Sequence, residues 1–405
     1  MSPTEKSEPE SPHELPRGFR FAGATGGIKA SGKSDTSLIV SDDPCVAAAV
    51  TTTNQVFAAP VLLCRQRTPR TTCRAVITNS GNANACTGQE GLEDAAAMCE
   101  QTAARIGCAA EDVLVMSTGV IGQRLPMEKV RRGIDRASES LGNSERDFLS
   151  AADAICTTDN FRKTASATFR ANGQTYRIAA MCKGAGMIAP NMATMLGVIV
   201  TDFPLSSELA QSSLRRIVER TFNRVSVDGH TSTNDTVVLL SSGQGDWVTS
   251  ESDASLFVET AADVCLKLAK LLVADGEGAA RFFEVAVRGA ASDADALSIA
   301  RCVAASPLVK TAIQGGDPNW GRIVSAAGYA GPPIDVERMS LLIEEHCVFR
   351  DGQPLAFDAA DMSGRMKRAS EVKLELTVGD GPGDSKYWSS DLTEDYVRFN
   401  SLYTT

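Results

Sequence analysis

The stretch KGAGMIAPNMATML, residues 183–196, joins a glycine-rich loop to an apolar segment that begins beside Thr194. A hydroxyl at this place could attack the carbonyl carbon of Ala193 and shift the acyl group from nitrogen to oxygen. Hydrolysis of that ester would free an α-amino group whose reference pKa, about 7.7–8.0, suits a general base near neutral pH. A threonine activated by its own amine is an established nucleophile. From spacing alone, a threonine that merely opens a strand is the commoner case.

Outward from this stretch, short apolar runs alternate with amphipathic ones, which indicates mixed α and β structure. Strands are predicted at residues 74–78, 113–116, 196–200, 236–240, 282–287, 341–349 and 372–378. Helices are predicted at residues 92–106, 209–222, 256–273 and 294–304. In one strand, Phe283, Val285 and Val287 share a face, opposite Glu284 and Ala286. The apolar stripes of the helices are expected to face the core.

Polar, turn-prone loops lie next to several of the apolar runs. They are NSGNANACTG (79–88), VDGHTSTND (227–235), DGEGA (275–279) and GGDPNWGR (315–322). Loops carried on a rigid scaffold often hold the chemistry of an enzyme. The chain has no G-x-x-x-x-G-K-[ST] sequence, and no G-x-G-x-x-G stretch follows a strand and opens a helix. The loops therefore predict an active site without a phosphate-binding motif.

The composition is that of a globular protein with no nucleic-acid or membrane partner. Of 405 residues, 43% are hydrophobic, and the formal net charge is -10. Binding to nucleic acid or to an anionic membrane needs a basic surface, whereas a small anionic substrate does not. Eleven cysteines without a C-x-x-C pair indicate reduced thiols. With only His13, His230 and His346 as histidines, we expect no metal site.

Residues 1–18 are rich in Ser, Pro and Glu. We expect a disordered tail there, because so few apolar side chains cannot offset the entropy of ordering. The tail has no signal-peptide stretch, and its acidity disfavours a transit peptide. No apolar run reaches the ~18 residues that a membrane span needs. A soluble, cytoplasmic protein is therefore expected.

The 183–196 stretch resembles the cleavage-site motif of the ornithine acetyltransferase (glutamate N-acetyltransferase) family. The resemblance continues through NSGNANACTG, STGVIG (117–122), VDGHTSTNDT, DGEGA, DPNWGR and the terminal NSLYTT (400–405), and covers nearly everything after residue 18. It implies an α+β fold of two packed β-sheets flanked by helices, like the N-terminal-nucleophile sandwich, with a smaller C-terminal lobe. It also implies self-cleavage between Ala193 and Thr194. The products would be an α chain of residues 19–193 and a β chain of residues 194–405, which stay together as α2β2.

The activity that the resemblance implies is a ping-pong acetyl transfer in arginine biosynthesis. Thr194 would take the acetyl group from N-acetylornithine, release ornithine and pass the acetyl group to glutamate. No cofactor is implied, and the use of acetyl-CoA as a second acetyl donor stays open. Two alternatives remain. One is a self-cleaving amidase or aminopeptidase, in which water replaces glutamate, and the other is an uncleaved binding protein.

Thr118 and Gly119 match the family's oxyanion-hole pair, and a hydroxyl and a glycine N–H are suitable donors, although STG alone would read as a turn. The family's substrate contacts map onto Thr157, Lys183, Thr194, Glu277, Asn400 and Thr405. Lys183 could pair with a substrate carboxylate or the oxyanion, and Glu277 with the substrate amino group. As ordinary loop residues, both would be solvated. The C-terminal contacts require a chain end that folds back over the pocket, whereas most chain ends are unstructured.

Three positions depart from the family pattern. Asn160 stands where a Thr is more common, so the choice between the hydroxyls of Thr157 and Thr158 as the substrate contact stays open. His230 replaces an Asp in the VDG-x-TSTND motif and is either a pH-sensitive group near the pocket or an ordinary loop histidine. Gly197 replaces an Ala, for which we expect only a packing effect.

Overall fold

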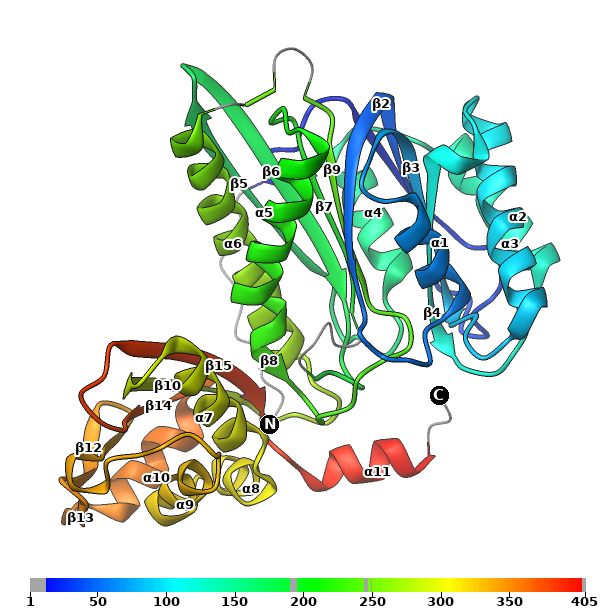
Figure 1. The fold of residues 1–405 in the computed structure, drawn as a ribbon. Coiled ribbons are helices and arrows are strands. Elements are labelled where there is room, and N and C mark those ends of the chain that lie inside the picture. The colour runs from blue at the N-terminus through cyan, green and yellow to red at the C-terminus, as the bar shows by residue number, and fades with distance from the viewer. Residues whose placement is uncertain (1–11, 190–194, 244–246, 249, 403–405) are drawn as a thin grey trace.

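The computed structural model describes residues 12–189, 195–243, 247–248 and 250–402 of the chain. Two mixed β-sheets with flanking helices form a larger lobe and a smaller C-terminal lobe (Figure 1). The predicted α+β class, with two mixed sheets, flanking helices and a smaller C-terminal lobe, is confirmed. The two sheets were predicted to pack against each other, whereas here they lie in different lobes. The second sheet belongs to the C-terminal lobe, where it has its own apolar core.

The larger lobe is built on an eight-stranded sheet in the order β4-β3-β2-β9-β7-β6-β5, with β1 beside β2. Its strands are β1 (Phe19–Ala24), β2 (Thr36–Thr51), β3 (Arg70–Asn82), β4 (Val113–Val120), β5 (Lys163–Ala171), β6 (Gln174–Lys183), β7 (Leu196–Thr201) and β9 (Thr236–Ser241). Its helices are α1 (Ala59–Arg67), α2 (Gly88–Ile106), α3 (Met127–Glu139), α4 (Glu145–Ile155), α5 (Ser207–Arg220) and α6 (Glu251–Ala274). Side chains alternate along β7, so that Ile199 packs with α5 and α6, whereas Val198 and Val200 face α4.

The smaller lobe contains a seven-stranded sheet in the order β13-β12-β11-β14-β10-β15-β8. Its strands are β8 (Val225–Ser226), β10 (Phe282–Ala290), β11 (Ser340–Ile343), β12 (His346–Arg350), β13 (Gln353–Pro354), β14 (Glu371–Thr377) and β15 (Gly383–Ser390). Its helices are α7 (Asp293–Ala305), α8 (Pro307–Gly315), α9 (Trp320–Gly328) and α10 (Ala359–Arg368). Short 3₁₀ helices lie at Ala110–Asp112, Phe222–Arg224 and Val336–Arg338. Strand β8 precedes β9 of the larger sheet and pairs with β15, so this segment links the lobes.

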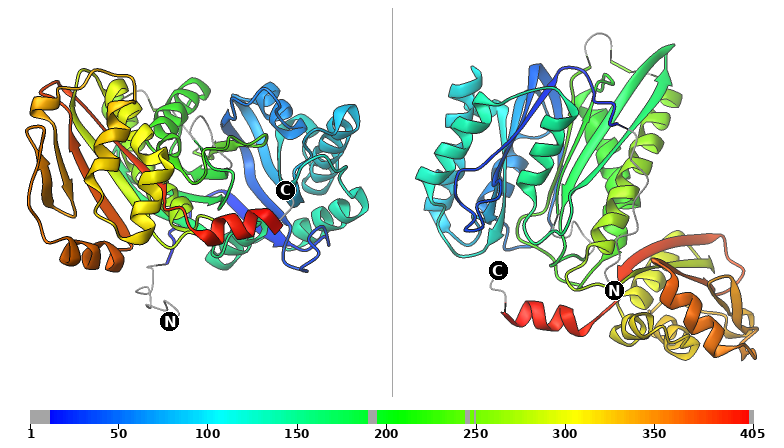
Figure 2. Two further views of the ribbon diagram at one scale, coloured as in Figure 1. Left: turned by 90° about the horizontal axis from the view of Figure 1, so that it is seen from below. Right: turned by 180° about the vertical axis from the view of Figure 1, so that it is seen from behind.

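The last helix, α11 (Glu394–Leu402), follows β15 and runs from the smaller lobe beneath the larger one (Figures 1 and 2). None of its residues is buried. In the part of the chain that the structure describes, no single helix is long and apolar enough to cross a membrane. Helices α7 and α8 pass that test only together, as a pair bent by 60°.

Each predicted helix and strand overlaps an element of the same type, with one correction. Residues 341–349, predicted as one strand, form the hairpin β11–β12. Glu344 and Glu345 have φ values of 47° and 68°, and two central residues with positive φ are what a tight hairpin turn requires. Consecutive glutamates are not typical of such turns, so the turn was not predicted. Phe283, Val285 and Val287 do share the core face of β10.

Part of the predicted tail, residues 1–18, lies among the described residues and contacts the larger lobe. The two ring nitrogens of His13 lie 3.0 and 3.1 Å from the hydroxyl oxygens of Ser166 and Thr164 on β5. Leu15 packs against the core cluster that includes α4. The ordered chain therefore begins before residue 19.

A buried carboxylate on β10 lies where the lobes meet. Glu284 accepts hydrogen bonds from Trp388 Nε1 at 3.0 Å and from Lys386 Nζ at 2.8 Å, both on β15. Lys270 of α6 lies 3.8 Å from the same carboxylate and over the Trp388 ring. Glu284 is only 7% exposed, so these partners, rather than water, stabilise its charge.

Replacing this carboxylate is expected to weaken the lobe interface. Glu284→Ala should lower the free energy of unfolding by about 1–3 kcal/mol, because the indole N–H of Trp388 would be buried without an acceptor. Chemical denaturation followed by circular dichroism measures the change. The matched control is Glu375→Ala on the neighbouring strand β14, whose ion pair with Arg288 is exposed, and it should cost less than ~1 kcal/mol. Equal losses would show that Glu284 has no special role.

Candidate active site

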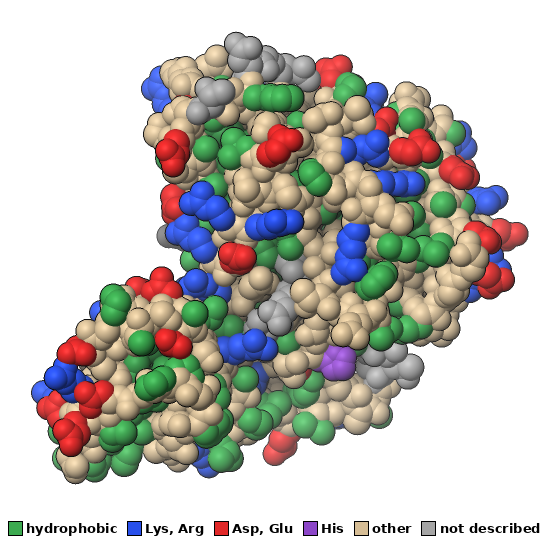
Figure 3. Space-filling model, viewed as in Figure 1, with side chains coloured by type: hydrophobic (Ala, Val, Ile, Leu, Met, Phe, Trp, Pro, Cys, Tyr) green, Lys and Arg blue, Asp and Glu red, His purple; other side chains and the backbone are tan. Residues whose placement is uncertain are grey.

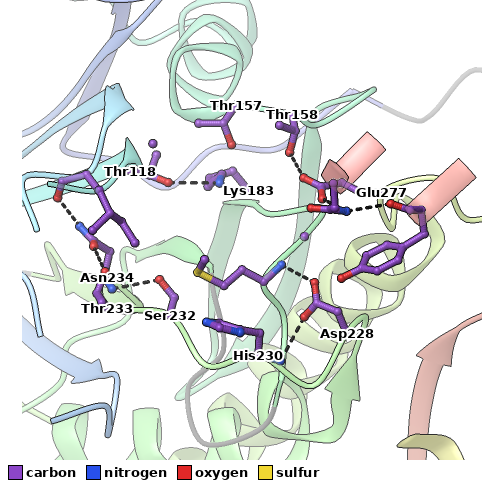
Figure 4. Close-up of a pocket in the computed structure, with 17 residues that line it drawn as sticks. Thr118, Thr157, Thr158, Lys183, Asp228, His230, Ser232, Thr233, Asn234 and Glu277 are labelled. Carbon is purple, nitrogen blue, oxygen red and sulfur yellow. Dashed lines mark hydrogen bonds between the residues drawn. The ribbon is translucent and has the colours of Figure 1, made fainter. Parts of the chain in front are cut away.

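A pocket of about 260 Å³ lies where the ends of β4 and β6 meet the VDGHTSTND loop, the DGEGA loop and α11 (Figure 4). It brings together six of the predicted site residues: Thr118, Gly119, Thr157, Lys183, Glu277 and Asn400. Ala193, Thr194 and Thr405 lie outside the described residues, so their predicted roles stay predictions.

Thr118 and Gly119 lie on β4 where it pairs with β3. Gly119 has a φ of +135°, and a Cβ atom there would lie 2.3 Å from the carbonyl carbon of Gly81, so only glycine fits this close approach. Lys183 Nζ donates to Thr118 Oγ1 at 3.2 Å. Because an ammonium group only donates, the Thr118 hydroxyl keeps its own hydrogen for an acceptor in the pocket.

Lys183 is the last residue of β6 and is only 4% exposed, unlike a solvated loop lysine. Glu277 faces the pocket from the DGEGA loop, on the side away from Thr118 (Figure 4). Its Oε1 accepts from Thr158 Oγ1 at 2.7 Å and its Oε2 from Asn400 Nδ2 at 3.2 Å. Burial raises the pKa of the Glu277 carboxyl, although these two hydrogen bonds oppose the shift. The bond to Asn400 shows that the C-terminal helix does fold back over the pocket.

Thr157 and Thr158 take different parts in the pocket. Both line it, but the hydroxyl of Thr158 donates to Glu277. Thr157 donates its backbone N–H to Asp159 at 2.9 Å, and its hydroxyl makes no hydrogen bond with another residue that the structure describes. Thr157 is therefore the better candidate for a substrate contact, and Thr158 orients the carboxylate.

A buried ionic cluster of Asp159, Lys163 and Asp275, which the sequence analysis missed, supports the pocket. Lys163 Nζ lies 2.7 Å from Asp159 Oδ1 and 2.6 Å from Asp275 Oδ2, and at most 1% of each side chain is exposed. Burial would raise the pKa of Asp159, but the charges of Lys183 and Lys163 hold it well below its usual range. Burial would lower the pKa of Lys163, and the two carboxylates raise it instead. Asp159 and Lys163 are therefore both charged at neutral pH.

Asp159 connects this cluster to two substrate-contact segments. Its carboxylate accepts from the N–H of Thr157 and, at 2.7 Å, from the N–H of Gly184, which follows Lys183. The only trace of this arrangement in the sequence is the opposite charge of Asp159 and Lys163, four residues apart. That spacing is common, so it does not identify a site.

Asp275 connects the cluster to the remaining side of the pocket. It accepts from the backbone N–H of Asn160 at 3.1 Å and from its side-chain amide at 2.9 Å, so the departure at Asn160 supports the cluster. Two residues after Asp275, the N–H of Glu277 donates to Ala185 O at 2.8 Å. The Lys183 and Glu277 sides of the pocket are thus connected by the ionic cluster and by a backbone hydrogen bond.

The VDGHTSTND loop holds the chain on both sides of the predicted cleavage site. Asp228 accepts from the N–H groups of Met187 and Ile188, at 2.6 and 2.9 Å. Asp235 accepts from the N–H of Met195 at 3.0 Å, and burial raises the pKa of its carboxyl. Carboxylates of one loop therefore anchor the described residues before and after this site.

The two remaining departures have separate explanations. His230 is exposed and lines the pocket, so its side chain lies within reach of a ligand there. A Cβ atom at Gly197 would lie 2.9 Å from Met195 Cε, so the usual Ala would require Met195 to move, as a packing effect implies.

The pocket is chemically suited to acyl transfer. It offers a hydroxyl and a glycine beside a buried ammonium group, which can stabilise an oxyanion, and a carboxylate that can bind an amino group. Within the described ranges, no group of three or more His, Cys, Asp or Glu side chains could hold a metal ion.

The ionic cluster is expected to make the free energy of unfolding depend on pH. Asp159→Asn should cost about 3–5 kcal/mol at neutral pH, because it leaves Lys163 incompletely paired in the interior. The depressed pKa of Asp159 means that its contribution is present above the unfolded value of about 3.9 and is lost as the pH falls. Denaturation at several pH values should therefore show the gap between wild type and variant closing in acid. The control is Asp153→Asn, whose ion pair with Arg162 is exposed, and a comparable loss there would contradict the assignment.

Comparison with known proteins places the whole chain in one family. Residues 20–405 match the model of the ArgJ family. "Arginine biosynthesis bifunctional protein ArgJ" of Rhodopirellula baltica is 64% identical over 404 residues, which are 99% of this chain and 98% of the relative. The protein of the same name from Geobacter sulfurreducens is 46% identical over 392 residues, 96% of this chain and 99% of the relative. The crystal structure of a Bacillus halodurans protein of that name is 40% identical, covers 50% of this chain and 96% of its own, and has a TM-score of 0.49. Because the family model and both sequence relatives match nearly the full length, the chain belongs to the ArgJ family.

Proposed function

We propose that the chain transfers an acetyl group from N-acetylornithine to glutamate through an acetyl-Thr194 intermediate, as a step of arginine biosynthesis. The observation that carries the proposal is the convergence of Thr118, Gly119, Lys183 and Glu277 on one pocket. Oxyanion donors on one side and a carboxylate on the other suit the reacting carbonyl and the α-nitrogen that ornithine and glutamate have in common. The names of the relatives support the pathway.

In the first half-reaction, the hydroxyl oxygen of Thr194 attacks the acetamide carbon and gives its proton to the α-amino group that cleavage frees. The carbonyl oxygen becomes an oxyanion, which Thr118 and Gly119 stabilise. Lys183 is assigned to the same oxyanion, because its ammonium group is 3.2 Å from Thr118 Oγ1. The C–N bond then breaks, the departing nitrogen takes the proton, and ornithine leaves an acetyl ester on Thr194.

In the second half-reaction, the amino group of glutamate attacks the acetyl ester. Glu277 is assigned to hold the amino group, because its carboxylate faces the cavity between Thr158 and Asn400. The C–O bond breaks, the proton of the attacking amine returns to the Thr194 oxygen through the α-amino group, and N-acetylglutamate leaves. The nucleophile, the base and the oxyanion donors are all protein groups, so the scheme needs no cofactor.

The donor range in this proposal extends to acetyl-CoA, because both relatives carry the name bifunctional. Attack of Thr194 on the thioester carbon breaks the C–S bond, and the thiol leaves with the proton that Thr194 lost. The glutamate half-reaction then follows unchanged.

The α fragment 19–193 and the β fragment 194–405 stay associated in this proposal, because strands from both build the larger sheet. Strand β6 pairs with β7, with Lys183 opposite Leu196, and β2 pairs with β9. Loss of one peptide bond leaves these backbone hydrogen bonds in place. The proposal includes an α2β2 assembly and a cytoplasmic location, which the eleven free cysteines support.

Intact-mass spectrometry tests the nucleophile. The wild type should give two masses, split between Ala193 and Thr194, whereas Thr194→Ala should give one full-length mass because it lacks the hydroxyl. Thr194→Ser keeps a hydroxyl and should still cleave. A single full-length mass for the wild type would contradict the mechanism, since Thr194 would have no free amine. Release of acetate instead of N-acetylglutamate by the cleaved enzyme would favour an amidase.

Glu277→Gln tests the amino-group contact. It should lower kcat/KM for glutamate about 10–100-fold, because a charge-assisted hydrogen bond is worth about 1.5–3 kcal/mol. Burial raises the pKa of Glu277, so wild-type activity should fall in acid at a pH above the ordinary Glu value of about 4.3, and the variant should lack this step. Self-cleavage should persist. Glu394→Gln, on the exposed part of α11, is the control, and an equal loss there would refute a specific contact.

A further inference from the structure

A second hollow, of about 270 Å³, lies between β2, α1 and α5. Two arginines line it, Arg65 of α1 and Arg215 of α5. The other lining residues are Ala49, Val50, Thr51, Thr68, Pro69 and Gln211. No acidic side chain is among these residues, so the hollow is cationic in a chain of net charge -10. Figure 3 shows Lys and Arg side chains on both sides of the depression between α5 and α1.

Arg65 is held in a fixed orientation in this hollow. Its Nε donates to Thr51 Oγ1 at 2.9 Å, and one terminal nitrogen donates to the carbonyl oxygen of Thr52. Its guanidinium carbon lies 4.4 Å from the centroid of the Phe57 ring. Arg215 is exposed and makes no hydrogen bond or ion pair with any residue that the structure describes. Both arginines thus have free donors and no carboxylate partner among the described residues.

The hollow is next to the active-site pocket. Thr52, which follows the lining residue Thr51, donates its hydroxyl to Ser232 O at 2.7 Å, and Ser232 lines the pocket. The segment that follows Thr52 also contacts the loop of Ser232, since the Ala58 N–H donates to Thr233 O at 2.9 Å, and it carries two exposed apolar side chains, Val56, 57% exposed, and Phe57, 38% exposed. One segment therefore contacts the pocket loop through Ala58 and Arg65 through Phe57, and it presents apolar side chains to solvent.

We infer that this hollow binds the phosphate groups of coenzyme A when acetyl-CoA is the acetyl donor, an inference that rests on the proposed use of that donor. Coenzyme A is a long ligand with a thioester at one end, a flexible arm and phosphates at the other end. The surface presents the matching groups in the same order: the pocket, the apolar Val56 and Phe57, and the arginines. The planar donor fork of arginine matches a phosphate group. Ornithine and glutamate carry no phosphate and have no use for this hollow.

The test compares three acetyl donors: acetyl-CoA, the short thioester S-acetyl-N-acetylcysteamine, which has no phosphates, and N-acetylornithine. Arg215→Glu should raise KM for acetyl-CoA about 10-fold or more, since a charge-assisted contact is replaced by repulsion. The KM values for the short thioester and for N-acetylornithine should not change. Arg215→Lys should bind acetyl-CoA more tightly than Arg215→Glu does. Arg216→Glu makes the same charge change on the next residue, which does not line the hollow, and should leave KM for acetyl-CoA unchanged.

Several outcomes would overturn the inference. They are an unchanged KM for acetyl-CoA in Arg215→Glu, an equal rise in Arg216→Glu, or an equal rise for the short thioester. Competition by inorganic phosphate as strong as that by free coenzyme A would indicate a general anion site instead. Wild-type turnover of N-acetylornithine without turnover of either thioester would also overturn it, while the acetyl exchange between ornithine and glutamate would stand.

Discussion

The placement of Lys163 between two buried carboxylates is the interaction on which the pocket depends. A buried charge that loses its partner costs several kcal/mol, so these three side chains have little freedom to separate. Because Asp159 also accepts the N–H groups of Thr157 and Gly184, the backbone of both segments is fixed with the ions. Asp275 accepts the N–H group of Asn160 and so fixes the backbone on the side of the pocket where Glu277 lies. A requirement for stability thus sets the positions of the groups that face the substrate.

Other aspartate side chains also accept backbone N–H groups and so order loops of the larger lobe. Asp35 accepts from the N–H groups of Gly26 and Ile28, each at 2.6 Å, and Asp228 and Asp235 anchor the stretch that contains the predicted cleavage site. A carboxylate can accept several N–H donors at once, so one side chain orders several residues of an irregular backbone. Loops ordered in this way keep their conformation without help from regular secondary structure.

Periodicity predicted four of the eleven α-helices in the described part of the chain and about half of its strands, because those elements bury one face. Strand β2 was missed because Asp42, Asp43 and Pro44 interrupt it, and the structure keeps it as one strand with a shifted register beyond Val40. The hairpin of β5 and β6 had a usable signal, since Asn172 is followed by a glycine and both take positive φ.

The site was less open to prediction from physical patterns. Family resemblance located Thr118, Lys183 and Glu277, whereas spacing alone left each of them with an ordinary structural explanation. The ionic cluster was not predictable, because Lys163 and Asp275 are 112 residues apart and only the tertiary fold brings them together. Asn160 looked like a departure from the family and proves to be a partner of that cluster.

The proposed acetyl-enzyme mechanism would let one pocket serve two unlike donors. The donors need to share only the position of the acetyl group, because everything else leaves before glutamate attacks. Figure 4 shows Glu277 on one side of the pocket and Thr118 and Ser232 on the other, with Lys183 between Thr118 and Glu277. The amino acid part of N-acetylornithine suits the Glu277 side, whereas the Ser232 side leads toward Phe57 and the arginines. Two exits from one oxyanion hole would let each donor be recognised by groups that the other does not touch, so that affinity for one could change without loss of the other.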